Sequence, residues 1–228
     1  MLGENRKKII LTADDFGKSG KANESILNLA KMGKLDRVSV MSEGVFTARE
    51  IEELKNAGVK IDIHLELDWQ KKRRGRTRER TAKQVIVFLA NYIRRNRVKR
   101  EWEKQIKKFR EIFGRYPDGI NSHEYVHFFP VYFKIALKLA GKHGVPFIRF
   151  GEDGFKGKRN SAHMILNHLR RWSKNNFVDS RIDSSDFFAS IDWIGDINSF
   201  MRDLPEGKTE IACHPERKEE FKIVEKYF

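Results

Sequence analysis

Two adjacent carboxylates follow a short apolar run near the start of the chain, in the stretch LTADDFG at residues 11–17. Residues 8–11 predict a buried strand that leads to Asp14 and Asp15. Adjacent strand side chains point to opposite faces, but at a strand end the backbone can turn both toward one pocket. Two carboxylates so close repel each other unless a cation or a shared proton relieves them, and a divalent metal would bind one and leave the other free. The alternative is a loop in which Asp15 caps the next helix and Asp14 is solvated.

Histidines occupy three further stretches that read as strand ends. His64 lies within IHLEL at residues 63–67, His123 and His127 lie within NSHEYVH at residues 121–127, and His214 follows the last apolar run. The ends of parallel strands are where α/β barrels and open α/β sheets place their chemistry. These residue types therefore indicate one hydrolytic or metal-binding site built from several strands.

The four motifs TADDFG, HLxL, SHxxVH followed by Pro130, and CHP occur in this order between residues 8 and 215. Together they resemble the YdjC-like carbohydrate deacetylase family. The resemblance implies a single-domain α/β fold over residues 1–228, a distorted (β/α) barrel of the polysaccharide-deacetylase type with about seven strands. It also implies metal-dependent removal of an N-acetyl group from an amino sugar.

The resemblance further implies that Asp15, His64 and His123 bind one divalent metal ion. Three such ligands leave coordination positions open, as a catalytic site requires. Magnesium or zinc is the expected ion, and manganese, nickel or cobalt would also suit, because nitrogen ligands favour transition metals.

The catalytic residues implied by the resemblance are Asp14 as general base and His214 as general acid. Arg149 would orient Asp14 or the substrate, since an arginine within the apolar run at residues 146–150 needs a partner. His127 is expected to contact substrate or to support the metal ligands, and Tyr125 to contact substrate.

Two positions depart from the family pattern. Tyr125 replaces the middle histidine of the usual SHxHxH loop, and Asn121 stands where an aspartate is common. Neither is one of the three implied ligands. We therefore expect altered substrate contacts and weaker support for His123 rather than loss of the metal.

The elements that must position these residues alternate between strand and helix patterns. Strands are expected at residues 8–13, 38–40, 59–67, 119–122, 146–150 and 209–213, with amphipathic helices between them, including one over 81–95. The alternation at 59–67 places Asp62, His64 and Glu66 on one face. Residues 151–207 give the weakest pattern, with helices indicated near 165–169 and 191–201. Because only 14 residues follow His214, we expect the closing helix to be reduced or missing.

Length and composition limit the class of protein. A chain of 228 residues with 39% hydrophobic and 34% charged residues suits one ordered, soluble domain. No apolar window long enough for a membrane span and no apolar signal core is present. The single cysteine, Cys213, excludes an internal disulfide and reads as a small buried residue. These features predict a cytoplasmic protein.

The chain is strongly basic, with a formal charge of +14 from 46 Lys and Arg against 32 Asp and Glu. Residues 71–83 hold eight basic side chains and one acid, and a second basic patch covers 94–100. The first patch follows the strand that carries His64, so as a loop at the mouth of the site it would favour an anionic or lipid-linked glycan; a solvated loop is the alternative.

Three other functions remain open from the sequence. The basic patches favour nucleic-acid binding, although they lack interleaved aromatic residues or a known binding module, so this partner is disfavoured. A catalytically inactive sugar-binding protein, or hydrolysis of another bond such as a phosphoester, would also suit the motifs. A homo-oligomer is compatible with the sequence as well.

Overall fold

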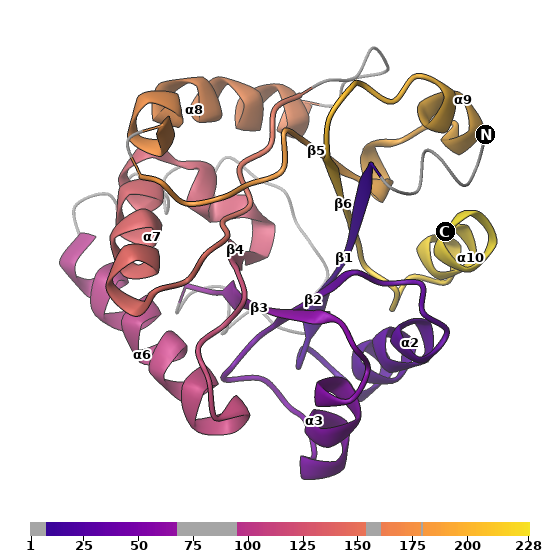
Figure 1. The fold of residues 1–228 in the computed structure, drawn as a ribbon, viewed down its shortest axis with the longest axis horizontal. Helices are drawn as coiled ribbons and strands as arrows, with labels where there is room; N and C mark the ends of the chain where they lie inside the picture. The colour runs from indigo at the N-terminus through magenta and orange to yellow at the C-terminus, as the bar shows by residue number, and fades with distance from the viewer. Residues whose placement is uncertain (1–7, 68–94, 154–160, 179) are drawn as a thin grey trace.

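A curled, six-stranded parallel sheet lies at the centre of the molecule. The computed structural model describes residues 8–67, 95–153, 161–178 and 180–228. The strand order is β4-β3-β2-β1-β6-β5. The curled sheet forms half of a barrel, and the helices surround its outer face (Figure 1). The strands are β1 Ile9–Phe16, β2 Arg37–Val40, β3 Lys60–Leu65, β4 Ile120–Ser122, β5 Phe187–Ser190 and β6 Thr209–Cys213.

The helices begin at capping signals that the sequence carries. Ser19 accepts a hydrogen bond from the backbone of Ala22, and Thr47 and Glu50 form a capping box. Pro130 occupies the first turn of its helix, and Gly144 ends that helix in the left-handed conformation. The helices are α2 Gly20–Lys31, α3 Ala48–Lys55, α6 Arg95–Phe113, α7 Pro130–His143, α8 Ser161–Val178, α9 Ile197–Arg202 and α10 Lys218–Tyr227, with short 3₁₀ helices η1 His123–Phe128 and η2 Ile191–Trp193.

Strand β3 shows that both faces of the sheet are buried. Its alternation is as predicted, but Asp62 and His64 are 1% and 2% exposed, so the polar face does not meet solvent. The Asp62 carboxylate accepts hydrogen bonds from Arg37 Nη2 at 2.6 Å and Nε at 2.8 Å. The alternation therefore separates an apolar layer under the helices from a polar interior, and the interior positions the site.

The α/β barrel-like fold predicted from the sequence is confirmed, with two corrections in the strands. Six strands are assigned in the described residues rather than about seven. The segment at 146–150 makes isolated parallel bridges, Ile120↔Ile148 and Phe147↔Asp183, instead of a continuous strand. A further bridge, Glu152↔Phe187, reaches β5, so this segment occupies the gap between the two edge strands. Its bonds are divided between two neighbours, which leaves each pairing too short for a strand.

The C-terminal third differs most from the sequence expectation. Strand β5 was not predicted, because its sequence, FFAS, shows no alternation of apolar and polar residues. The helix expected over 191–201 is divided into η2 and α9, with Asp196 capping α9. The closing helix, expected to be reduced or missing, is present as the ten-residue α10. The predicted helix at 81–95 and the basic stretch at 71–83 lie outside the described residues, apart from Arg95 in α6.

None of the helices in the described part of the chain combines the length and the apolar character that crossing a bilayer requires.

Candidate metal centre and active site

The end of β1 is irregular at the paired aspartates. Pairing between β1 and β2 shifts register between Ala13 and Phe16, and Asp15 has a φ of 75°. A left-handed residue is uncommon outside glycine, although Asp and Asn tolerate it better than most. This irregularity lets two neighbouring carboxylates, each 1% exposed, reach separate groups of partners.

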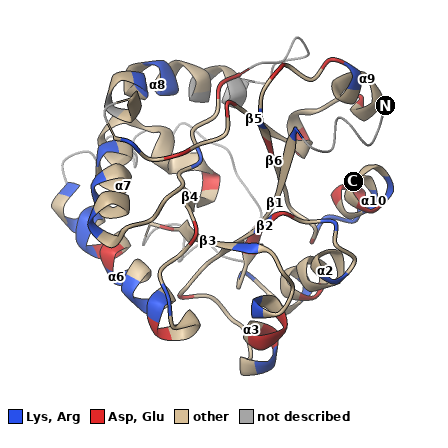
Figure 2. Ribbon diagram, in the orientation of Figure 1, with Lys and Arg blue, Asp and Glu red and all other residues tan. Residues whose placement is uncertain are grey.

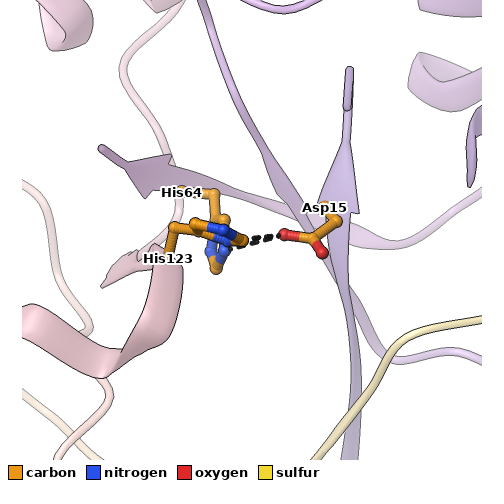
Figure 3. Close-up of side chains that lie close together, drawn as sticks. All are labelled: Asp15, His64 and His123. Atoms are coloured by element: carbon orange, nitrogen blue, oxygen red, sulfur yellow. Dashed lines mark hydrogen bonds and ion pairs between the residues drawn. The ribbon is translucent and has the colours of Figure 1, made fainter. Parts of the chain in front are cut away.

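Asp15 lies against two imidazoles (Figure 3). Its Oδ1 is 3.0 Å from His123 Nδ1 and 3.3 Å from His64 Nε2. Asp15 belongs to β1, His64 to β3, and His123 to the first turn after β4. One ligand atom from each residue lies within 4.8 Å of the others, the arrangement that the predicted metal site requires.

The donors at this cluster suit a divalent ion. One carboxylate oxygen and two imidazole nitrogens match the ligand types of zinc and related ions. Burial opposes ionisation of Asp15, but the imidazoles of His123 and His64 outweigh it and hold the pKa of Asp15 well below its usual value. Lys18 Nζ also donates to Asp15 Oδ2 at 2.9 Å and contacts Glu216. The cluster therefore places an ionised carboxylate among groups that neutralise it.

Asp14 faces a guanidinium instead. Arg149 Nη1 and Nη2 donate to the two oxygens of Asp14 at 2.7 and 2.8 Å, and the arginine is fully buried. Burial raises the pKa of Asp14, but Arg149 outweighs that effect and lowers the pKa to about 2. Of the two roles predicted for Arg149, this geometry matches orientation of Asp14.

Glu210 is a member of this group that the sequence analysis missed. Its Oε1 accepts from Arg149 Nε at 2.8 Å and from Thr12 Oγ1 at 2.9 Å, and the residue is fully buried. The available signal was a charged residue inside the apolar run at 209–213, the same signal that singled out Arg149. Glu210 therefore anchors the guanidinium that holds Asp14.

His214 follows β6 and is held from the closing helix. Its backbone N–H donates to Glu220 Oε2 at 2.7 Å, and its Nδ1 lies 3.4 Å from the same oxygen. Burial disfavours the charged ring, but the carboxylates of Glu220, Asp15 and Asp14 outweigh it and raise the pKa of His214. Glu220 was also missed, because the closing helix α10 was expected to be reduced or missing.

Comparison with known proteins identifies the family. The model of the family described as YdjC-like protein matches residues 8–226. The chain belongs to the YdjC-like family. A chitooligosaccharide deacetylase of Escherichia fergusonii is 29% identical over 143 residues, covering 60% of this chain and 57% of the relative. A carbohydrate deacetylase of Homo sapiens is 26% identical over 160 residues, covering 65% of this chain and 50% of the relative. The chain thus spans about half the length of the curated relatives it matches.

A solved structure supports the fold of this YdjC-like chain. A protein of Enterococcus faecalis V583 described as a cellobiose-phosphate cleavage protein aligns with a TM-score of 0.61 and 21% identity. The alignment covers 90% of this chain and 80% of that one. At this identity the likeness bears on the fold alone.

His127 and Tyr125, the two remaining predicted site residues, have different surroundings. His127 is fully buried, with Nδ1 2.6 Å from Ser122 Oγ and Nε2 2.9 Å from the Arg149 carbonyl oxygen. Burial lowers its pKa to about 3. Both nitrogens are engaged inside the protein, which argues against direct substrate contact and matches the supporting role.

Tyr125 belongs to an aromatic group that includes Phe188 and Trp193. Its ring meets the rings of Phe188 and Trp193 edge-on, with centroids 5.4 Å away in each case. Burial and the nearby Asp14 carboxylate raise the pKa of Tyr125, so its hydroxyl stays protonated. Tyr125 and Trp193 are both half-buried.

Asn121 corrects one expectation. From the family pattern, an asparagine at this position was expected to weaken the support of His123. In the structure Asn121 Oδ1 lies 2.6 Å from Nδ1 of His64 instead.

Proposed function

We propose that this protein is a metal-dependent carbohydrate deacetylase that removes an N-acetyl group from an amino sugar. The observation that carries the proposal is the convergence of Asp15, His64 and His123 beside Asp14 and His214 in a YdjC-like chain. The names of the relatives, chitooligosaccharide deacetylase and carbohydrate deacetylase, support the substrate class.

The metal would be held by Asp15, His64 and His123. Magnesium or zinc is proposed first, with manganese, nickel or cobalt compatible with the same donors. When bound, a divalent ion supplies Lewis-acid chemistry, because it polarises a carbonyl and lowers the pKa of a water.

Asp14 is proposed to accept the proton of the attacking water. The Arg149 guanidinium keeps it ionised and fixes its plane through the bonds at 2.7 and 2.8 Å. Each carboxylate oxygen has a second lone pair, so both can accept from Arg149 and one can still accept from water. The low pKa makes Asp14 a weak base, and the reaction depends on the water being acidified.

His214 is proposed to give a proton to the departing amine, which is otherwise a poor leaving group. Because its pKa is raised, the ring stays protonated to a higher pH than an ordinary histidine ring does. Glu220 holds the histidine at the end of β6.

The test is acetate release from a panel of N-acetylated sugars, combined with metal analysis of the same preparation. Asp14→Asn and His214→Ala should each lower the rate by on the order of 10²–10⁴ while metal content stays nearly unchanged. If Asp14→Asn strips the metal, the roles of the two aspartates are reversed. Metal bound without release of acetate from any amide or ester substrate would favour an inactive sugar-binding protein.

We further propose that the substrate is an anionic or lipid-linked glycan. It depends on the formal charge of +14 and on the basic stretch at 71–83, which lies outside the described residues. Lys and Arg also line the outer helix α6 (Figure 2). Phosphorylated N-acetylglucosamine should be turned over with higher kcat/KM than the neutral sugar at low salt, and added salt should remove the difference. Changing Arg73, Arg74 and Arg76 to Ser should have the same effect as salt, whereas equal rates at every ionic strength would contradict this proposal.

A further inference from the structure

His64 begins a chain of three hydrogen-bonded, buried side chains. Its Nδ1 is 2.6 Å from Asn121 Oδ1, and Asn121 Nδ2 donates to Ser39 Oγ at 2.7 Å. The three residues are 2%, 1% and 0% exposed. They come from the neighbouring strands β3, β4 and β2, and His64 and Asn121 are direct partners in the parallel register.

The direction of these bonds determines which nitrogen of His64 carries a proton. An amide oxygen only accepts, so the proton of a neutral His64 lies on Nδ1. The reverse amide orientation would need the Ser39 hydroxyl to donate to Asn121 Oδ1, and it would place the proton of His64 on Nε2. In the orientation of the structure, Asn121 Nδ2 donates to Ser39 Oγ and Oδ1 faces His64. The lone pair is therefore on Nε2, the atom 3.3 Å from Asp15 Oδ1.

Metal binding needs this tautomer. A neutral imidazole binds an ion through its unprotonated nitrogen, and the hydrogen bond at the other nitrogen sets which one that is. At the metal cluster it is Nε2 of His64 that faces Asp15.

We propose that Asn121 is a positioning residue that fixes the tautomer and ring orientation of His64 and thereby sets the affinity of the site for a metal ion. The inference depends on the metal site of the proposed function and not on the sugar or the reaction. The amide oxygen accepts the hydrogen bond without carrying a negative charge. The Nε2 of His64 is therefore a less basic metal ligand than it would be if a carboxylate accepted this bond. Asn121 therefore sets a moderate affinity rather than the highest one that this site can reach.

The first experiment uses the unsubstituted protein. Long-range ¹H–¹⁵N NMR of the metal-free protein reports the protonated nitrogen of each histidine ring, with His64→Gln identifying the His64 signals. We expect a proton on Nδ1 of His64 and none on Nε2. A proton on Nε2 would overturn the proposal without any change at Asn121.

The second experiment measures zinc affinity by competition with a chelator. Asn121→Leu removes the acceptor at similar size and should weaken zinc binding by about 10–100-fold. Asn121→Asp keeps an acceptor for His64 Nδ1, and this variant should bind zinc at least as tightly as the original protein. Ser39→Ala keeps the acceptor but frees the amide, and a smaller weakening is expected.

These variants separate the inference from the proposed function. Zinc affinity in Asn121→Leu within twofold of the original would contradict the inference and leave the deacetylase proposal standing. If Asn121→Leu loses zinc affinity but the original protein releases no acetate, the inference stands and the deacetylase proposal is contradicted. If Asn121→Leu does not fold, Ser39→Ala and the NMR measurement still decide, and a protein that binds no zinc would contradict both.

Discussion

The two neighbouring aspartates of β1 face two different groups of side chains. On the Asp14 side, the guanidinium of Arg149 pairs with Asp14 and Glu210 in a buried network. On the Asp15 side, two imidazoles and Lys18 surround the carboxylate. Both carboxylates are almost fully buried, so burial alone does not distinguish them.

The difference lies in how firmly the positive charge is held. Arg149 is fully buried and stays charged at any accessible pH, because a guanidinium does not lose its proton in proteins. The Lys18 side chain is 26% exposed, and an imidazole binds a metal ion in its neutral form. The cation that holds Asp14 is thus permanent, whereas on the Asp15 side a metal ion can take the place of Lys18 and of ring protons.

Replacing Arg149 tests the permanent side and should have the largest effect. Arg149→Met leaves Asp14 and Glu210 buried without their cation, and breaking a buried pair in this way typically costs about 3–5 kcal/mol of unfolding free energy. Urea unfolding measures the change. Arg49→Met, which breaks an exposed pair with Glu53, is the matched control and should change stability by less than about 1 kcal/mol. Equal effects from both substitutions would mean that the Asp14 network contributes no more than a surface pair.

Replacing Asp15 tests the exchangeable side. Asp15→Asn keeps the size of the side chain and tolerates the positive φ, but it removes a charged ligand. Zinc affinity should fall by more than about 100-fold, beyond the usual cost of losing an outer partner. Asp14→Asn is the control and should retain zinc, measured by the same chelator competition. Similar losses in both variants would show that the two sides do not differ in metal binding.

The histidine that joins the two sides predicts a pH dependence. His127 connects Ser122, next to His123, with the backbone of Arg149. Its folded pKa of about 3 lies below the ordinary 6.5, so the stability it contributes is complete above pH 6.5 and is lost as the pH falls toward 3. The loss should approach about 1.4 kcal/mol per pH unit.

Unfolding free energies between pH 7 and pH 4 measure this term. The difference between the original protein and His127→Gln, which does not titrate, isolates it from the other histidines. Parallel curves for the two proteins would show that His127 takes up its proton equally in both states.

Lys18 should give the smallest effect. Lys18→Met removes a partly exposed cation that competes with a metal for Asp15, so zinc should bind a few-fold more tightly. Stability should fall by no more than about 1 kcal/mol, because the pair is reached by solvent. Zinc titration and thermal unfolding together measure both changes. Weaker zinc binding would mean that Lys18 assists the site instead.

The sequence identified the first half of the fold and the residues of the Asp15 side, and local chemistry explains why. Polar residues stand at or near the ends of β1, β3 and β4, and each pattern is contained in a few consecutive positions. On the Asp14 side, a charged residue within an apolar run marks Arg149 and Glu210 separately, but neither run shows that the two side chains pair. The residues of β5, FFAS, show no alternation, and the segment at 146–150 divides its bonds between two neighbours. Those outcomes are set by tertiary packing.

The three residues of the Asp15 cluster come from β1, β3 and the turn after β4, and this distribution has a thermodynamic consequence. An ion that binds all three joins segments that the unfolded chain holds far apart, so it binds the folded state in preference. At a free concentration 100 times its Kd, such an ion adds about 2.7 kcal/mol to the unfolding free energy. Metal supply and chelation then regulate how much folded protein a preparation contains, in addition to its activity.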